Sequence, residues 1–350
     1  MEQTGFLNMD FQTCLAHLMQ HGMVSNPRGS ETKELLNYNI TLLNPRNRVI
    51  TFKARKTNTR YLLGEFIWYL SGSNDPEGIL PYSKFWNNIR NSGEMKEYPA
   101  GTVNSNYGER IFGHHNKTLV PRLEYHMTPA GYNEKGQLVI EPHETPVVYG
   151  DSQWDSTIAL LKQDKDTRQA VMNIHIPEDR HKGNKDVACT LTLQFFIREE
   201  ALHMIVNMRS NDIIRGFTND VFQFTMLQEC MMLQLRDTYP DLKLGHYFHN
   251  AGSIHIYELH YEMADQILKE DAIDLEMIPM DRFDKEICSH LLCIEQEWRE
   301  AGMPEDFNFE PIWEWTQLTP YWQTVVNALF LKDEAALHQL FAHPEAEDAE

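Results

Sequence analysis

Glu65 is the residue whose type conflicts most clearly with its surroundings in the sequence. Residues 57–71, TNTRYLLGEFIWYLS, have helical spacing and precede Gly72, a residue type common just after a helix end. On such a helix the neighbours of Glu65 at three and four residues are all apolar or aromatic. A carboxylate on that face is either costly or has a raised pKa, and buried acids of this kind gather at functional sites. The simpler alternative is a side chain that reaches water at the helix end.

Cys189 is the second candidate, a lone thiol at the start of the apolar segment CTLTLQFFI. A cysteine of this kind is more often a small core residue than a nucleophile, so its spacing alone does not decide its role. The string RSND at residues 209–212 favours a catalytic role for Cys189, because it ends a predicted strand and leads through a loop to a helix. Arginine, serine and backbone N–H groups that converge at a helix N-terminus form a binding site for one phosphate.

Two acids, Asp212 and Asp220, flank the same loop. Each has a simpler explanation, because an aspartate near a helix start interacts favourably with the helix dipole and needs no ligand. For Asp220 alone that explanation would suffice. Solvation alone nevertheless does not explain two acids beside an anion site, so we treat both as candidate site residues.

The charge balance limits the class of partner. The chain has 31 basic and 51 acidic residues, a formal net charge of −20, and therefore repels a nucleic-acid backbone as a whole. A few clustered arginines can still hold a small anion. The five cysteines include no CxxC pair, and neither a secretory signal nor an apolar stretch long enough for a bilayer is visible. We expect a cytoplasmic protein without a membrane partner.

Periodicity predicts the elements that must position these residues. Strands are expected at 170–176, 189–197 and 202–209, and helices at 57–71, 219–239 and 256–268. Strands grouped in one sheet, with helices packed over them, define an α+β fold.

The domain organisation follows from the absence of a linker rich in proline, glycine or serine. We expect a single domain, residues 1–350, with a core at about 28–270. Loops with a hairpin around Leu119 to Val139 are expected within an insertion at about 94–150, and a mostly helical C-terminal extension at about 284–345.

One string carries a family resemblance. RSNDIIRGFTNDVFQF, with the Cys189 segment upstream and HNAGSIHIYELH downstream, resembles the thymidylate synthase family from about Arg28 to Leu268. The resemblance implies an α+β homodimer in which the central sheet forms the dimer interface and helices pack on its other face. It also implies a pyrimidine nucleotide substrate, 5,10-methylenetetrahydrofolate as the cosubstrate, and no metal.

The resemblance assigns roles at matching positions of this sequence. Cys189 would attack C6 of the pyrimidine, and Glu65 would be the general acid/base. The phosphate ligands would be Arg28, Arg209, Ser210 and, from the neighbouring subunit, Arg168.

Further roles concern the sugar, the base and the folate. His255 and Tyr257 would hold the deoxyribose hydroxyl, and Gln194 would lie near the base. The folate side and the surroundings of the nucleophile would comprise Arg55, Trp86, Tyr107 and Asp212, of which Asp212 also borders the substrate.

Asp220 is the most informative departure from the family pattern, because the family's synthases have asparagine there. An asparagine amide can donate to O4 of uracil and accept from N3–H, whereas an ionised carboxylate only accepts. Cytosine presents a 4-amino donor instead. At this position the sequence therefore resembles the deoxycytidylate (dCMP) hydroxymethylase branch of the family.

Other departures surround the nucleophile and the folate side. Thr190 replaces a histidine, residues 186–188 replace a segment with proline and leucine, and Asn58 replaces another histidine. Gln169 replaces the second arginine of a phosphate pair, and the tail PEAEDAE has no clear counterpart to the family's folate-closing segment. A looser folate pocket favours capture of water and hence a hydroxymethyl product.

Several alternatives stay open at this point. They are a dCMP methylase, a dUMP hydroxymethylase or thymidylate synthase, a non-catalytic nucleotide- or RNA-binding homologue, and a purely structural chain. Retention of Cys189 and Glu65 argues against the last two, and the acidic charge argues against RNA. Two biological settings also stay open: a virus that modifies its DNA in the host cytoplasm, and a biosynthetic pathway.

Overall fold

The protein is built around one mixed β-sheet. The computed structural model describes residues 4–83, 86, 103, 105–113, 122–132, 138–147, 152–180 and 186–342. Within them, seven strands form the sheet in the order β1-β2-β9-β7-β6-β5, with β8 beside β9. Their bounds are β1 Met23–Ser25, β2 Thr32–Leu42, β5 Val171–Asn173, β6 Thr190–Arg198, β7 Ala201–Met208, β8 Asn211–Asp212 and β9 Lys243–Tyr257.

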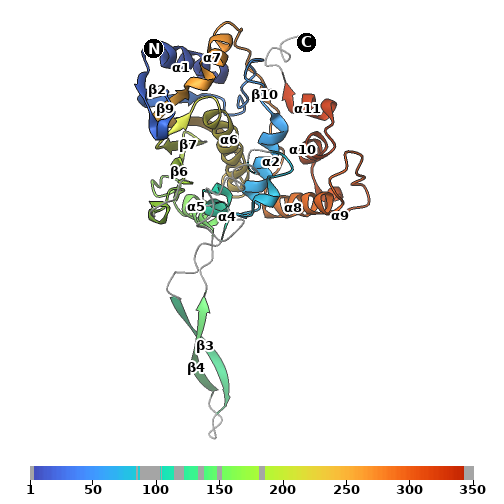
Figure 1. The fold of residues 1–350 in the computed structure, drawn as a ribbon. Coiled ribbons are helices and arrows are strands. Elements are labelled where there is room, and N and C mark those ends of the chain that lie inside the picture. The colour runs from blue at the N-terminus through green and yellow to red at the C-terminus, as the bar shows by residue number, and fades with distance from the viewer. Residues whose placement is uncertain are drawn as a thin grey trace.

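Helices cover one face of this sheet. Their bounds are α1 Leu7–His21, α2 Thr59–Leu70, α4 Tyr107–Phe112, α5 Gln153–Gln163, α6 Gly216–Leu235, α7 Tyr261–Ile267, α8 Lys285–Glu300, α9 Trp313–Gln317, α10 Pro320–Phe330 and α11 Glu334–Leu340. Helix α6 contacts β7 and β9 on one side and α2 on the other, so it lies at the centre of the core (Figure 1). The predicted α+β class is confirmed.

Strand alternation explains which face is covered. In β6 the side chains of Leu193, Phe195 and Ile197 are fully buried, whereas the residues between them are partly exposed. Strand β7 repeats the pattern with buried Leu202, Met204 and Val206, because successive side chains point to opposite faces of a sheet. The buried set faces the helices. The predicted role of the other face as a dimer interface stays a prediction.

The three predicted strands are confirmed as β5, β6 and β7, although β5 spans only Val171–Asn173 of the predicted 170–176, and helix boundaries also differ. Helix α6 begins at Gly216 rather than at Asn219. The helix expected over 256–268 was partly wrong, because β9 continues to Tyr257, paired with Thr32 of β2, and α7 begins only at Tyr261. Sheet pairing with β2 thus overrides the helical spacing of these residues.

Two small antiparallel pairs lie outside the main sheet. Strands β3, Arg122–Tyr132, and β4, Leu138–Val147, pair with each other, later in the sequence than the hairpin expected around Leu119 to Val139. Strands β10, Glu276–Met277, and β11, Phe341–Ala342, form the second pair.

The C-terminal extension packs against α2, the helix that carries Glu65. The rings of Trp322 on α10 and Phe66 on α2 are stacked, with centroids 6.4 Å apart and an interplanar angle of 7°. Arg60 on α2 donates a hydrogen bond of 3.2 Å to the carbonyl of Ala328 and pairs with Glu334 at 2.7 Å. The extension therefore supports the outer face of α2.

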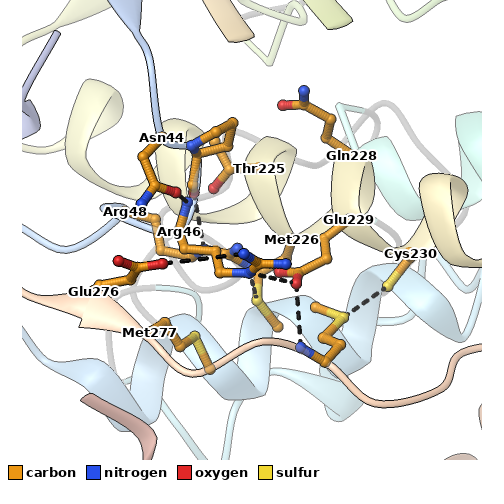
Figure 2. A network of polar contacts seen from close by, with 12 residues as sticks. Asn44, Arg46, Arg48, Thr225, Met226, Gln228, Glu229, Cys230, Glu276 and Met277 are labelled. Carbon is orange, nitrogen blue, oxygen red and sulfur yellow. Dashed lines mark hydrogen bonds and ion pairs between the residues drawn. The ribbon is translucent and has the colours of Figure 1, made fainter. Parts of the chain in front are cut away.

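A fully buried ion pair holds three segments together beneath the core (Figure 2). Glu229 of α6 accepts from the Arg48 guanidinium at 2.5 Å and from the Arg46 guanidinium at 2.8 Å. The backbone N–H of Met280, beyond β10, donates to the same carboxylate at 3.1 Å. The side chains of Arg48 and Glu229 are both 0% exposed, so neither charge has water as an alternative partner.

Removal of Glu229 is expected to destabilise the fold strongly. Glu229→Ala would leave Arg48 buried without a counter-ion, a change that typically costs about 3–5 kcal/mol of unfolding free energy. Denaturant unfolding measures the loss. The matched control is Glu286→Gln on α8, which breaks an exposed pair with Arg282, just before that helix, and should cost no more than about 0.5 kcal/mol. Equal losses in the two variants would contradict this account of the buried pair.

Candidate active site

A cavity of about 1140 Å³ opens at one end of the sheet. Strands β6 and β7 are antiparallel, and β7 and β9 are parallel, so the start of β6 and the ends of β7 and β9 meet at this end. Helices α2, α4 and α6 supply further walls. The sequence-predicted residues that line the cavity are Arg28, Arg55, Glu65, Trp86, Tyr107, Cys189, Arg209, Ser210, Asp212, Asp220, His255 and Tyr257.

Cys189 lies immediately before β6, with its thiol close to one cation. Its backbone N–H donates to the Tyr107 hydroxyl at 3.2 Å, and the Arg209 guanidinium lies 3.5 Å from Sγ. Burial raises the pKa of the thiol, and the charges of Arg209 and Arg28 only partly offset that effect. The two arginines therefore favour the thiolate, but desolvation outweighs their effect. The thiol becomes a nucleophile only when it loses its proton.

Arg209 also fixes the chain on which the nucleophile lies. Its guanidinium donates to the carbonyls of Val187 and Ala188, at 2.9 Å each, and its backbone N–H donates to the carbonyl of Cys189 at 2.8 Å. Movement of Arg209 would therefore displace Cys189.

Glu65 lies deep in the cavity wall, 5% exposed, as the sequence indicated. It accepts hydrogen bonds from the Tyr61 hydroxyl at 2.7 Å and from the Gln223 amide at 3.1 Å, and the Trp86 indole N–H donates to Tyr61 at 3.1 Å. Burial raises the pKa of Glu65 to about 7, while the two hydrogen bonds oppose that shift. A carboxyl group with this pKa can both donate and accept a proton near neutral pH.

Asp220 occupies the second turn of α6 and does not cap the helix. Its Oδ2 accepts a hydrogen bond of 2.7 Å from the Asn211 amide, and its side chain lines the cavity. Burial raises the pKa of Asp220 to about 7, with a smaller contribution from the charge of Glu65. The simple explanation of an acid placed for the helix dipole therefore does not account for Asp220.

Asp212 fits the simpler explanation better. Its Oδ1 accepts from the backbone N–H groups of Ile214 and Arg215, at 2.8 and 3.3 Å, and so closes the turn before α6. Its side chain nevertheless borders the cavity.

The predicted anion site is brought together in part. Arg28, in the turn Pro27–Gly29, lines the same cavity as Arg209 and Ser210, although 181 residues separate Arg28 from Arg209 in the sequence. Arg28 has a positive φ of 55°, a backbone conformation that few non-glycine residues adopt.

The sugar and folate candidates come from different elements. His255 and Tyr257, near the end of β9, have ring centroids 5.3 Å apart. Arg55 donates to the Ile214 carbonyl at 2.6 Å and to the Thr218 hydroxyl at 2.8 Å, so part of its donor capacity is already used. The cavity reaches both groups.

Two predicted residues do not reach the cavity of their own chain. Arg168 is exposed, and its expected contribution to a neighbouring subunit stays a prediction. Gln194 lies on the partly exposed side of β6, and its amide donates to the Arg168 carbonyl at 3.0 Å. Gln194 is not among the residues that line the cavity, and its expected place near the base stays a prediction.

Sequence reasoning missed the polar residues that hold the two carboxyl groups. Gln223 and Asn211 each donate to one of them, and buried His249 in turn contacts Asn211. Gln223 follows Asp220 by three residues on an otherwise apolar stretch, a signal that could have revealed it. His249 gave no such signal, since it lies on a strand that we did not predict.

Two properties of the described residues complete the site. They contain no group of three or more histidine, cysteine, aspartate or glutamate side chains arranged to hold a metal ion. None of their helices combines the length and apolar character needed to cross a bilayer.

Comparison with known proteins agrees with the geometry of the site. The family model for thymidylate synthase matches residues 9–290. The chain is 29% identical over 217 residues to the deoxycytidylate 5-hydroxymethyltransferase of Enterobacteria phage T4, covering 59% of this chain and 71% of that protein. It is 27% identical over 271 residues to the deoxyuridylate hydroxymethyltransferase of Bacillus phage SP01, covering 76% of this chain and 61% of that protein.

A similarity of smaller extent exists to the thymidylate synthase of Bacillus licheniformis, 29% identical over 119 residues, 34% of this chain and 40% of that protein. The match of the family model covers 282 of the 350 residues, which include the whole sheet, α2 to α7 and all but the first two residues of α1. The chain belongs to the thymidylate synthase family.

Proposed function

We propose that this protein is a dCMP hydroxymethylase, which transfers a one-carbon group to C5 of the cytosine ring and completes the product with water. The observation that carries the proposal is Asp220, which borders the same cavity as Cys189 and Glu65. The likeness to a phage deoxycytidylate 5-hydroxymethyltransferase supports it.

The base preference follows from the hydrogen-bonding capacity of Asp220. Its ionised carboxylate can accept from the 4-amino group of cytosine but meets O4 of uracil as a second acceptor. A buried acceptor that faces another acceptor loses about 1–3 kcal/mol relative to a satisfied one. That difference corresponds to roughly 5- to 150-fold in selectivity.

Cys189 begins the reaction by forming a covalent bond between Sγ and C6 of the ring. The electron pair of the C5–C6 double bond then makes C5 a carbon nucleophile, which divides one difficult substitution into easier steps. Arg209, at 3.5 Å from Sγ, stabilises the thiolate form and would also hold the phosphate.

Glu65 exchanges protons during these steps, directly or through water. Its pKa of about 7 leaves both protonation states populated at neutral pH, and Tyr61 and Gln223 hold its two oxygens in place. It can therefore orient a water molecule and take a proton from it as the hydroxymethyl group forms.

The cosubstrate proposed is 5,10-methylenetetrahydrofolate, which supplies the one-carbon unit when bound. A cavity of about 1140 Å³ exceeds the usual volume for one drug-sized ligand, about 300–1,000 Å³, and so has room beyond the nucleotide. Trp86 and Arg55 on its wall offer an aromatic face and a cation, which fit a flat, anionic ligand.

The protein acts as a cytoplasmic homodimer in this proposal. Exposed Arg168 lies outside the cavity of its own chain, next to the uncovered face of the sheet, where a second copy would receive it. This supports a phosphate ligand given in trans.

Product analysis tests the proposal. Purified protein, methylenetetrahydrofolate and either dCMP or dUMP are incubated together, and the products are identified by mass. We expect 5-hydroxymethyl-dCMP from dCMP, because Asp220 selects the 4-amino group and water completes the product. Methyl-dCMP would keep the base assignment and reject water capture. Turnover of dUMP alone, as the name of the SP01 relative would imply, would refute the proposal.

A further inference from the structure

A chain of three hydrogen bonds leads from the core to Asp220. The Tyr247 hydroxyl lies 2.8 Å from Nδ1 of His249, and Nε2 of His249 lies 3.0 Å from Oδ1 of Asn211. The Asn211 amide then donates to Oδ2 of Asp220 at 2.7 Å. Tyr247, His249 and Asn211 are 0%, 1% and 2% exposed, so water does not complete the bonds of this chain.

Neutral His249 and the amide donated to Asp220 together set the direction in which these bonds run. Burial lowers the pKa of His249 to about 3, so the imidazole is neutral and carries one proton. A proton on Nε2 satisfies the Asn211 carbonyl oxygen, and Nδ1 then accepts from the Tyr247 hydroxyl. With its oxygen engaged, Asn211 has only its N–H groups to offer to Asp220.

The backbone leaves room for this arrangement. Strand β8 holds Asn211 beside Ile254 of β9, in the same sheet as Tyr247 and His249. A Cβ atom on Gly216 would lie 2.9 Å from Nδ2 of Asn211 and 3.5 Å from Oδ2 of Asp220. Glycine at the first residue of α6 thus keeps the contact between the two side chains free.

We propose that Asn211 is the positioning residue for Asp220, and that His249 and Tyr247 leave Asn211 only its N–H groups to offer. Oδ2 of Asp220 is then occupied by Asn211, and Oδ1 of Asp220 is the oxygen that binds the pyrimidine. Oδ1 has no hydrogen bond among the described residues and belongs to a side chain on the cavity wall. This inference rests on the proposed function, since it explains how the 4-amino group is selected. It adds three residues: Asn211, which borders the cavity, and His249 and Tyr247, which lie buried behind it.

The pKa of Asp220 is the property that distinguishes a positioning role of Asn211 from a merely structural one. The bond from Asn211 lowers the pKa of Asp220 against the effect of burial, so its loss must raise that pKa. A protonated Oδ1 can donate to O4 of uracil, whereas an ionised one accepts from the 4-amino group. The other titratable groups that face Asp220 are Glu65, Tyr61 and Tyr69 of α2, Tyr107 of α4, Cys189 beside β6, and Tyr247 of β9.

The test is the ratio of kcat/KM for dCMP to that for dUMP, measured as a function of pH. Effects of Glu65 and Cys189 that are common to both substrates cancel in this ratio. We expect Asn211→Ala to lower the ratio about tenfold or more at neutral pH and to move its midpoint to higher pH. Tyr247→Phe, which removes only a hydroxyl group, should change both in the same direction by less.

Thr225→Val is the matched control, because the Thr225 hydroxyl is buried in α6 and bonds only to the carbonyls of Val221 and Phe222. It should leave both the ratio and its midpoint unchanged. An unchanged midpoint in Asn211→Ala and Tyr247→Phe would overturn the inference.

Failure of the proposed function is distinguishable from failure of this inference. If the wild-type protein converts only dUMP, the proposed function fails. The inference is then judged by the pKa of the Asp220 carboxyl carbon, followed by ¹³C NMR in the wild-type protein and in Asn211→Ala. A higher pKa in the variant supports the positioning role, and an equal pKa rejects it.

Discussion

Cys189→Ser is expected to reduce turnover by about 10³-fold or more, because the hydroxyl group is a far weaker nucleophile than a thiolate at neutral pH. Burial raises the pKa of the Cys189 thiol, and the charge of Arg209 lowers it. Among the described residues, no other cysteine lines the cavity. The loss is measured as kcat with saturating dCMP and methylenetetrahydrofolate. Mass spectrometry of the intact protein should show a nucleotide adduct only where the thiol is present.

The matched control is Cys293→Ser, which changes an exposed thiol on α8. Its turnover should equal that of the wild-type protein. If Cys189→Ser retained appreciable turnover, the covalent mechanism would be wrong, and the site would have to act through Glu65 and bound water alone.

Asp220→Asn is expected to reverse the base preference from dCMP to dUMP. The amide can donate to O4 and accept from N3–H of uracil, while it loses the purely accepting edge that faces the 4-amino group. The expected change in the ratio of kcat/KM values is about 5- to 150-fold, since a mismatched buried group costs about 1–3 kcal/mol. The ratio is measured from parallel assays with the two nucleotides.

The pH dependence of this ratio has a defined sign. Because burial raises the pKa of Asp220 to about 7, the carboxyl is largely protonated below that pH and ionised above it. The wild-type preference for dCMP should therefore strengthen as the pH rises through about 7. In Asp220→Asn the amide does not titrate, so the ratio should be flat over the same range.

Asp212→Asn controls for the loss of one negative charge near the cavity. Asp212 closes the turn before α6 and does not contact Asn211 or Asp220 through any hydrogen bond shown by the structure. In Asp212→Asn the ratio of kcat/KM for dCMP to that for dUMP should equal that of the wild-type protein. A preference that stayed unchanged in Asp220→Asn would mean that Asp220 does not face the base.

The sequence by itself determined the fold class and the chemical groups. Three strands and helix α2 were predictable because their periodicity is local, and Glu65 was conspicuous because its helical neighbours are all apolar. The order of the blocks around Cys189 and Arg209 identified the family. The resemblance proposed Asp220 as the residue that faces the base, and its hydrogen-bonding capacity then favoured cytosine without any coordinates.

The tertiary structure decided which side chains meet. Helical spacing misplaced the start of α7, because the pairing that extends β9 to Tyr257 is with β2, a strand far away in the sequence. The contact of His249 with Asn211, 38 residues apart, exists only because β8 and β9 are paired.

The raised pKa values of Cys189, Glu65 and Asp220 likewise come from the packing of several elements around each group. A sequence pattern shows which face of its own element a residue occupies. Desolvation and the direction of a hydrogen bond depend on what the rest of the chain places against that face, and only the folded structure supplies it.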